Sequence, residues 1–304
     1  MNANDNLLPP EPPEPAEPVP QSIEPAPLAD SFRSEDAPSA GESPAPRKRV
    51  LPDDLCVPWD WLDIGILVLL AFAGIVLISL LMMLALRLAG VSAARIRNSP
   101  GADSLIAIVA QIFLDLGLLA YLAAQMRLRF HSPFWRTVGW RPIQTRLLPR
   151  TLPYSALALG GFSLAVVVAF AEGLFPPKHP LPIQAVTQTP HAAVLFMLSA
   201  VLVAPVVEET IFRGYLYPVA ARSFGVGMGV LVTGALFGLL HARQLWGGWW
   251  QIALLVMVGI VFTIARAATR TVVASYILHA SYNALPVIAA LLSSVKLRHF
   301  VPLH

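Results

Sequence analysis

Long apolar stretches separated by short polar ones dominate the chain after residue 60. An α-helix needs about 20 consecutive apolar residues to cross the hydrocarbon core of a bilayer. Stretches of about this length or longer lie near residues 64–86, 104–126, 153–175, 195–221, 228–247, 249–267 and 271–293. The pattern predicts an all-α fold, a polytopic transmembrane helical bundle with about 7–8 spans. The stretch RQLWGGWWQ, between the fifth and sixth spans, predicts a short turn with its tryptophans at headgroup level.

Composition supports a membrane class and excludes several others. Of the 304 residues, 56% are hydrophobic and 13% charged, whereas soluble domains carry roughly 25% charged residues. The single cysteine, Cys56, excludes an intrachain disulfide and a thiolate metal cluster. No basic patch interleaved with aromatic residues occurs, so we expect no nucleic-acid partner.

The chain divides into three parts by composition. Residues 1–50 are rich in proline and glutamate and carry nine of the 18 acidic residues. Such a segment cannot bury enough apolar surface to offset its ordering entropy, so it predicts a disordered tail. Residues 60–150 hold the first two spans and a basic, aromatic loop expected on the membrane surface, and residues 151–295 hold the remaining spans.

The distribution of lysine and arginine predicts the orientation in the membrane. With seven spans and a cytoplasmic N-terminus, 14 of the 21 basic residues fall on the cytoplasmic side. Because cytoplasmic loops carry the excess of basic residues, we expect this orientation, in the plasma or inner membrane of the cell.

Two adjacent glutamates interrupt the fourth span, within VEETIFRG. A charge at the centre of a span costs about 2.5–3.5 kcal/mol on insertion scales, so an ionisable residue there needs a partner or a function. Arg213 follows Glu209 by four residues, which places both on one helix face and predicts a structural ion pair. Glu208 is rotated by about 100° from Glu209, so it faces the bundle interior or a wet cavity, where a carboxylate could exchange protons or simply join two helices.

Histidines and an asparagine interrupt two later spans. His241 shares a helix face with Phe237, and Gly234 and Gly238 form a small-residue pair that lets another helix approach closely.

On the last span, His279 and Asn283 are four residues apart and share a face. Two polar groups on one apolar helix indicate a common polar target, although a packing contact between helices is the simpler alternative. The lengths of the apolar stretches place Glu208 and His241 near the middle of their spans and His279 well inside its own. Glu208, His241, His279 and Asn283 can therefore converge at a similar depth from three helices. Asp115 is also deep in a span, and an arginine of another helix is its expected partner.

These residues resemble the motifs of one family, the CPBP family of intramembrane proteases (CAAX protease and bacteriocin-processing, also called Abi), related to type II CAAX prenyl endopeptidases. The family pattern is two glutamates, three residues and an arginine, then Phe-x-x-x-His, then His-x-x-x-Asn or Asp. Here the pattern is matched, in order, by the following residues: Glu208, Glu209, Arg213, Phe237, His241, His279 and Asn283. Pro205 and the FRG sequence fit as well, and the resemblance covers roughly residues 190–290.

The resemblance implies a membrane-embedded peptidase core over residues 151–295, with its motifs in 205–283. Glu208 with His241 would activate water, and His279 with Asn283 would stabilise the oxyanion. We favour catalysis without a cofactor. The alternative is zinc held by Glu208, His241 and His279, because two histidines and a glutamate form a known catalytic zinc set.

Other functions fit the same residues. A non-catalytic membrane scaffold or immunity-type protein would use them as packing contacts, and a proton-coupled transporter would use them as a relay. The expected partners are the lipid bilayer and a membrane-anchored protein or peptide substrate. The sequence defines neither the substrate, nor its prenylation, nor the oligomeric state.

Overall fold

A computed structural model describes residues 52–99, 101–144, 152–176 and 190–300, and all of these lie in one compact unit, Val50–His304. The predicted disordered tail, 1–50, and the end of the basic loop lie outside the described residues. The helices of the described residues are η1 (Asp53–Leu55), α1 (Trp61–Leu88), α2 (Ala93–Arg97), α3 (Ala102–Leu128), α4 (Phe134–Thr137), α5 (Leu152–Leu174), α7 (Pro190–Leu198), η2 (Ser199–Val203), α8 (Ala204–Glu209), η3 (Thr210–Leu216), α9 (Tyr217–Phe224), α10 (Val226–Leu240), α11 (Trp249–Thr269) and α12 (Val272–Phe300).

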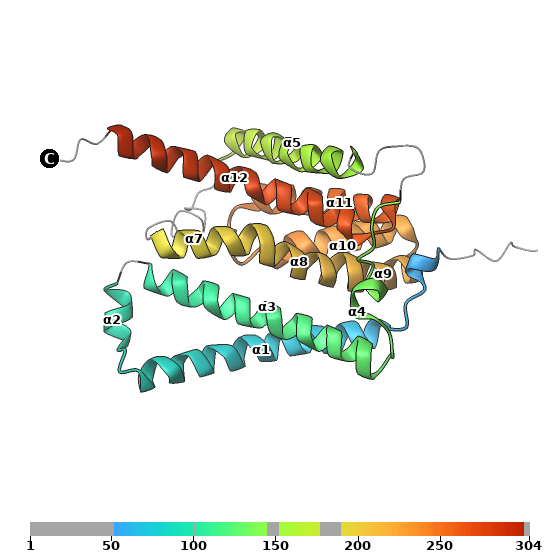
Figure 1. Ribbon diagram of the computed structural model, residues 1–304, viewed down its shortest axis with the longest axis horizontal. Helices are drawn as coiled ribbons and strands as arrows, with labels where there is room; N and C mark the ends of the chain where they lie inside the picture. Colours follow the sequence, from blue (N-terminus) through green and yellow to red (C-terminus); the bar gives the residue numbers. More distant parts are fainter. Residues whose placement is uncertain (1–51, 100, 145–151, 177–189, 301–304) are drawn as a thin grey trace, which may run out of the picture. The chain divides into compact units, whose positions relative to one another are not determined.

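This part of the chain contains helices and no strand, as the hydrophobic pattern predicts. Within it, six helices are long and apolar enough to cross a membrane, and α10 is a shorter apolar helix. The chain is therefore a multi-pass membrane protein. Figure 1 shows α1 beside α3 and α5 beside α12, and these pairs are in contact.

The first helix begins where its sequence provides a cap. The Asp60 side chain accepts hydrogen bonds from the amides of Leu62 and Asp63, while Asp63 accepts from the Asp60 amide in return. This capping box satisfies amides that have no partner within the helix. Asp63 also forms an ion pair with Arg129, which ties the start of α1 to the end of α3.

The helix that carries the two glutamates is continuous from α7 to α9 but contains two π-helical segments, η2 and η3. Each π segment is followed by an α-helix with a proline at its second residue, Pro205 in α8 and Pro218 in α9. A proline cannot donate a hydrogen bond to the preceding turn and its ring crowds the carbonyl there, so the wider π turn accommodates it. The two glutamates end α8, between these distortions.

The fifth apolar stretch differs from its prediction. The sequence predicts a span over 228–247, but α10 ends at Leu240, and residues 241–247 form turns before α11. A helix of 15 residues rises only about 22 Å. His241 is therefore the C-cap of a short helix rather than a residue in the middle of a span.

Close backbone packing holds α10 against α11. An added Cβ on Gly234 would lie 2.6 Å from the backbone nitrogen of Ile260, and one on Gly238 would lie 2.6 Å from that of Val256. Only glycine permits this approach, as the small-residue pair predicts. The contact fixes the end of α10, which carries Phe237 and His241.

The basic loop after α3 is not only a surface element. Val138 is buried, and the Trp140 indole donates to Thr210 Oγ1 at 2.9 Å. The Val272 amide donates to the Gly139 carbonyl at 2.9 Å. Residues 138–140 therefore pack against the end of the bundle, and the position of the loop at the membrane surface stays a prediction.

Candidate active site

A buried ion pair forms the base of the candidate site. Arg213 Nη1 lies 2.8 Å from Glu209 Oε1, and both side chains are 0% exposed. Arg213 also donates through Nε to Thr263 Oγ1 at 3.2 Å and through Nη2 to the Gly259 carbonyl at 2.8 Å, both on α11. The pair that the four-residue spacing predicts is present, and its arginine also joins η3 to α11.

Aromatic rings enclose the guanidinium. The Arg213 Cζ atom lies 4.4 Å from the ring centroid of Phe237 and 5.5 Å from that of Phe262. A cation is attracted to the face of an aromatic ring, and more strongly when water is excluded. Phe237, the motif phenylalanine, thus packs on the ion pair, and Phe262 is a contributor that the sequence reasoning missed.

His279 lies between the two glutamates. Its Nδ1 lies 2.9 Å from Glu209 Oε1, and its Nε2 lies 3.7 Å from Glu208 Oε2. The histidine is 4% exposed, while the Glu208 side chain is 25% exposed. Glu209 is buried, with Oε1 shared by Arg213 and His279 and Oε2 without a hydrogen-bond partner. Glu208 is the carboxylate that a small molecule such as water can reach.

His241 approaches the same region from α10. Its Nδ1 lies 3.0 Å from the Phe237 carbonyl, so Nδ1 carries the hydrogen and Nε2 is left to accept a proton. The Phe237 ring lies between the two histidines, 5.3 Å from His241 and 5.6 Å from His279 between ring centroids. No hydrogen bond or ion pair joins His241 to Glu208, both of which are described residues.

Asn283 and His279 have different partners, although both lie on one face of α12. Asn283 Nδ2 donates to the Ala200 carbonyl in the π segment η2 at 2.8 Å. The common target that their spacing indicated is therefore absent from their hydrogen bonds. Each side chain instead connects α12 to a different level of the helix that carries the glutamates.

Asp115 is held on its own helix. Gln111 Nε2 donates to Asp115 Oδ1 at 2.7 Å, and the aspartate is buried. Its partner is thus a glutamine one turn earlier rather than an arginine of another helix.

The described side chains do not form a metal centre. Between residues 52 and 300, leaving out the undescribed gaps, no group of three or more His, Cys, Asp or Glu side chains is arranged to hold a metal ion. In particular, Glu208 and His279 approach each other, but His241 contacts the ring of Phe237 instead of joining them. The donor set does not fit the three-ligand zinc site that is the alternative for these residues.

Comparison with known proteins supports the resemblance drawn from the motifs. Residues 190–285 match the family model described as type II CAAX prenyl endopeptidase Rce1-like, which is consistent with the CPBP family. This segment runs from α7 into α12 and contains all seven motif residues. No curated protein and no solved structure gives a significant match to the chain.

Proposed function

We propose that this multi-pass membrane protein is an intramembrane endopeptidase that hydrolyses peptide bonds of membrane-anchored proteins or peptides. The observation that carries the proposal is the position of His279, between a buried, paired glutamate and a partly exposed one. If His279 only held two helices together, a contact with one of these carboxylates would be enough. The second carboxylate, reachable by water, is what acid–base chemistry requires.

Charge balance supports a transferable proton at this site. Arg213 neutralises Glu209, so Glu208 and His279 must together be neutral if the buried cluster is to carry no net charge. An ionised Glu208 beside an imidazolium satisfies this condition, and so does a protonated Glu208 beside a neutral histidine. Because burying an unpaired charge is costly, the pair holds one proton that can reside on either side chain.

Hydrolysis then starts from the state with an ionised Glu208 and a water bound beside it. The water oxygen adds to the scissile carbonyl carbon and its proton passes to Glu208, assisted by the free Nε2 of His241. The C–N bond breaks when Glu208 returns a proton to the amide nitrogen, which leaves as an amine while the carbonyl carbon becomes a carboxylic acid.

Donors for the developing oxyanion come from α12. An imidazolium at His279 presents an Nε2–H, and Asn283 has a second amide N–H besides the one given to Ala200. Preorganised donors in a site that excludes water stabilise such a charge more strongly than water does. No step requires a cofactor.

Helix position favours cleavage near one bilayer surface. His279 lies seven residues after the start of α12 at Val272, which corresponds to a rise of about 10 Å. That end of the bundle carries the basic loop, so under the positive-inside rule it faces the cytoplasm, in a plasma or inner membrane. The substrate class is a protein or peptide held in the membrane by a lipid or apolar anchor.

The test compares the membrane peptidome of the native cell expressing wild-type protein with that of cells expressing Glu208→Gln at matched levels. Glu172→Gln, a change of a half-buried glutamate in α5, is the control. A protease predicts that defined membrane-anchored polypeptides lose their cleaved forms only with Glu208→Gln. If the three peptidomes agree under several growth conditions while partners still co-purify with the variant, the protein is a scaffold.

A further inference from the structure

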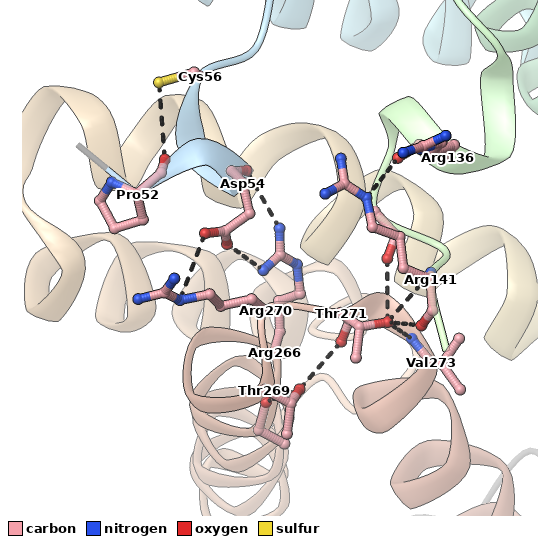
Figure 2. A network of polar contacts seen from close by, with 12 residues as sticks. Pro52, Asp54, Cys56, Arg136, Arg141, Arg266, Thr269, Arg270, Thr271 and Val273 are labelled. Atoms are coloured by element: carbon pink, nitrogen blue, oxygen red, sulfur yellow. Dashed lines mark hydrogen bonds and ion pairs between the residues drawn. The ribbon is translucent and has the colours of Figure 1, made fainter. Parts of the chain in front are cut away.

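A polar cavity lies at the end of the bundle where α1 and α12 begin and α11 ends. Its volume is about 290 Å³, and its polar lining includes Asp53, Asp54, Arg136, Arg141 and Arg266. Figure 2 shows Arg266 beside Asp54, and Arg141 between Thr271 and Arg136. None of the motif residues lines it.

Positive charge exceeds negative charge around this cavity. Asp54 is already paired, with its Oδ2 2.7 Å from Arg266 Nη1 and its Oδ1 4.0 Å from Arg270 Nε. Arg136 and Arg141 are exposed and form no ion pair with the described residues. Arg141 instead donates through Nε to the Arg136 carbonyl at 3.3 Å, and Asp53 is the one further acid of the lining.

One donor of the cavity is buried without an acceptor. The Arg266 side chain is 1% exposed, yet its Nε has no hydrogen-bond partner. Asp54 Oδ1 likewise has an ionic neighbour but no hydrogen bond. A buried polar atom without a partner marks a place where a water, ion or ligand is expected.

Gly139 leaves room beside this donor. Its φ is +91°, a conformation suited to glycine, and an added Cβ would lie 3.7 Å from Arg266 Nε and 3.5 Å from Nη2. A side chain at this position would lie against the edge of the buried guanidinium and 3.3 Å from Val272 Cγ2, and glycine leaves that edge uncovered by a side chain of its own. Planar guanidinium groups bind phosphate oxygens through paired N–H groups.

The position of the cavity indicates the source of an anion. It is built from η1, the loop around α4 and the end of α11, where apolar helices give way to polar sequence. This is the level at which lipid headgroups meet a membrane protein, and anionic headgroups gather next to juxtamembrane basic residues.

We propose that this cavity is a binding site for a phosphate group, held by Arg136, Arg141 and Arg266. The phosphate comes either from the headgroup of an anionic phospholipid or from solution. A phosphate offers enough oxygen atoms to accept from three arginines at once, which a carboxylate with two oxygens does less well. The proposal is independent of peptidase activity, because none of these residues belongs to the candidate active site.

The test uses the full chain purified in a neutral detergent, with binding followed by native mass spectrometry and by the shift in thermal unfolding. The probes are dioctanoyl phosphatidic acid, dioctanoylglycerol, which lacks the phosphate, and inorganic phosphate. Saturable binding of phosphatidic acid but not of dioctanoylglycerol is expected. Losing two charge-assisted contacts in Arg136→Gln/Arg141→Gln should weaken it about tenfold or more.

Matched changes at other exposed arginines provide the control. Arg87→Gln/Arg243→Gln removes the same charge outside the cavity lining and should leave the affinity unchanged. Competition by inorganic phosphate would identify the phosphate itself as the ligand, and binding without such competition would identify the lipid headgroup. Equal binding by both double variants, or equal binding of dioctanoylglycerol, would overturn the proposal.

Discussion

Nδ1 of His279 lies 2.9 Å from Oε1 of Glu209, so the second glutamate of the adjacent pair, and not the first, anchors this histidine. Glu209 thereby holds both His279 and Arg213, because the same oxygen also accepts a hydrogen bond from Arg213. Among the described residues, Glu208 has a single close ionic neighbour, His279 Nε2 at 3.7 Å. Two residues that are chemically identical and adjacent in sequence are thus expected to respond differently to the same substitution.

Glu209→Gln should unfold the protein more easily as well as inactivate it. Breaking a buried ion pair by removing one partner typically costs about 3–5 kcal/mol, because the other charge stays buried and unpaired. Arg213 is 0% exposed and would be left in that state. The free energy of unfolding, measured in mixed detergent micelles, should fall by this amount.

Glu208→Gln provides the contrast. Its side chain is partly exposed and makes no hydrogen bond to another described residue, so the free energy of unfolding should change by less than about 1 kcal/mol. Cleavage should fall by about 10²–10⁴-fold, the range attributed to a general base. Equal destabilisation by both variants would show that the two glutamates share one structural role.

Asn283→Ala should reveal whether the asparagine is a packing clamp as well as a donor. Its Nδ2 donates to the part-buried Ala200 carbonyl, and losing this hydrogen bond should cost about 0.5–1.5 kcal/mol. We therefore expect lower stability together with slower cleavage, measured on the same preparation. Slower cleavage at unchanged stability would assign Asn283 to the oxyanion alone.

The sequence predicts the local features of the site well and the tertiary ones poorly. Apolar runs predict the helices because a helix satisfies its own backbone in lipid. The Glu209–Arg213 pair follows from helical spacing alone, since both residues lie on one continuous helix. Each of these predictions needs only neighbours in sequence.

The remaining features depend on neighbours that are distant in sequence. His279 contacts Glu209 because of how α12 packs against α8, and Asn283 contacts Ala200 because of how α12 packs against η2. The short α10 was missed because residues 241–247 include apolar residues such as Leu245 and Trp246, so hydropathy does not mark the end of the helix. Pro205 and Pro218 were the available signals for the two π segments.

Gly234→Ala should displace the end of α10. The new Cβ would lie 2.6 Å from the Ile260 nitrogen, which is too close, so α10 and α11 must separate. Overpacking of this kind costs about 1–3 kcal/mol. Because Phe237 and His241 lie on the displaced segment, cleavage should fall too.

The matched control is Gly227→Ala in the same helix, where an added Cβ meets nothing within 4 Å. Alanine favours a helix over glycine by about 1 kcal/mol, so this variant should be as stable as wild type or more stable and fully active. Thermal unfolding and cleavage assays on both variants make the comparison. A harmless Gly234→Ala would show that the close backbone contact is dispensable.

Trp140→Phe should connect the basic loop to the chemistry of the site. The indole Nε1 donates to Thr210 Oγ1 at 2.9 Å, and Thr210 directly follows Glu209. Phenylalanine keeps an aromatic ring beside Tyr276 but loses this hydrogen bond, worth about 0.5–1.5 kcal/mol. If the loop positions the glutamates, cleavage should slow through a lower kcat.

Trp250→Phe is the matched control, because it removes a comparable indole hydrogen bond, 3.0 Å to the Ala171 carbonyl, between α11 and α5. It should cost similar stability and leave kcat unchanged, whereas an equal fall in kcat for both variants would show that lost stability, not loop position, slows the reaction.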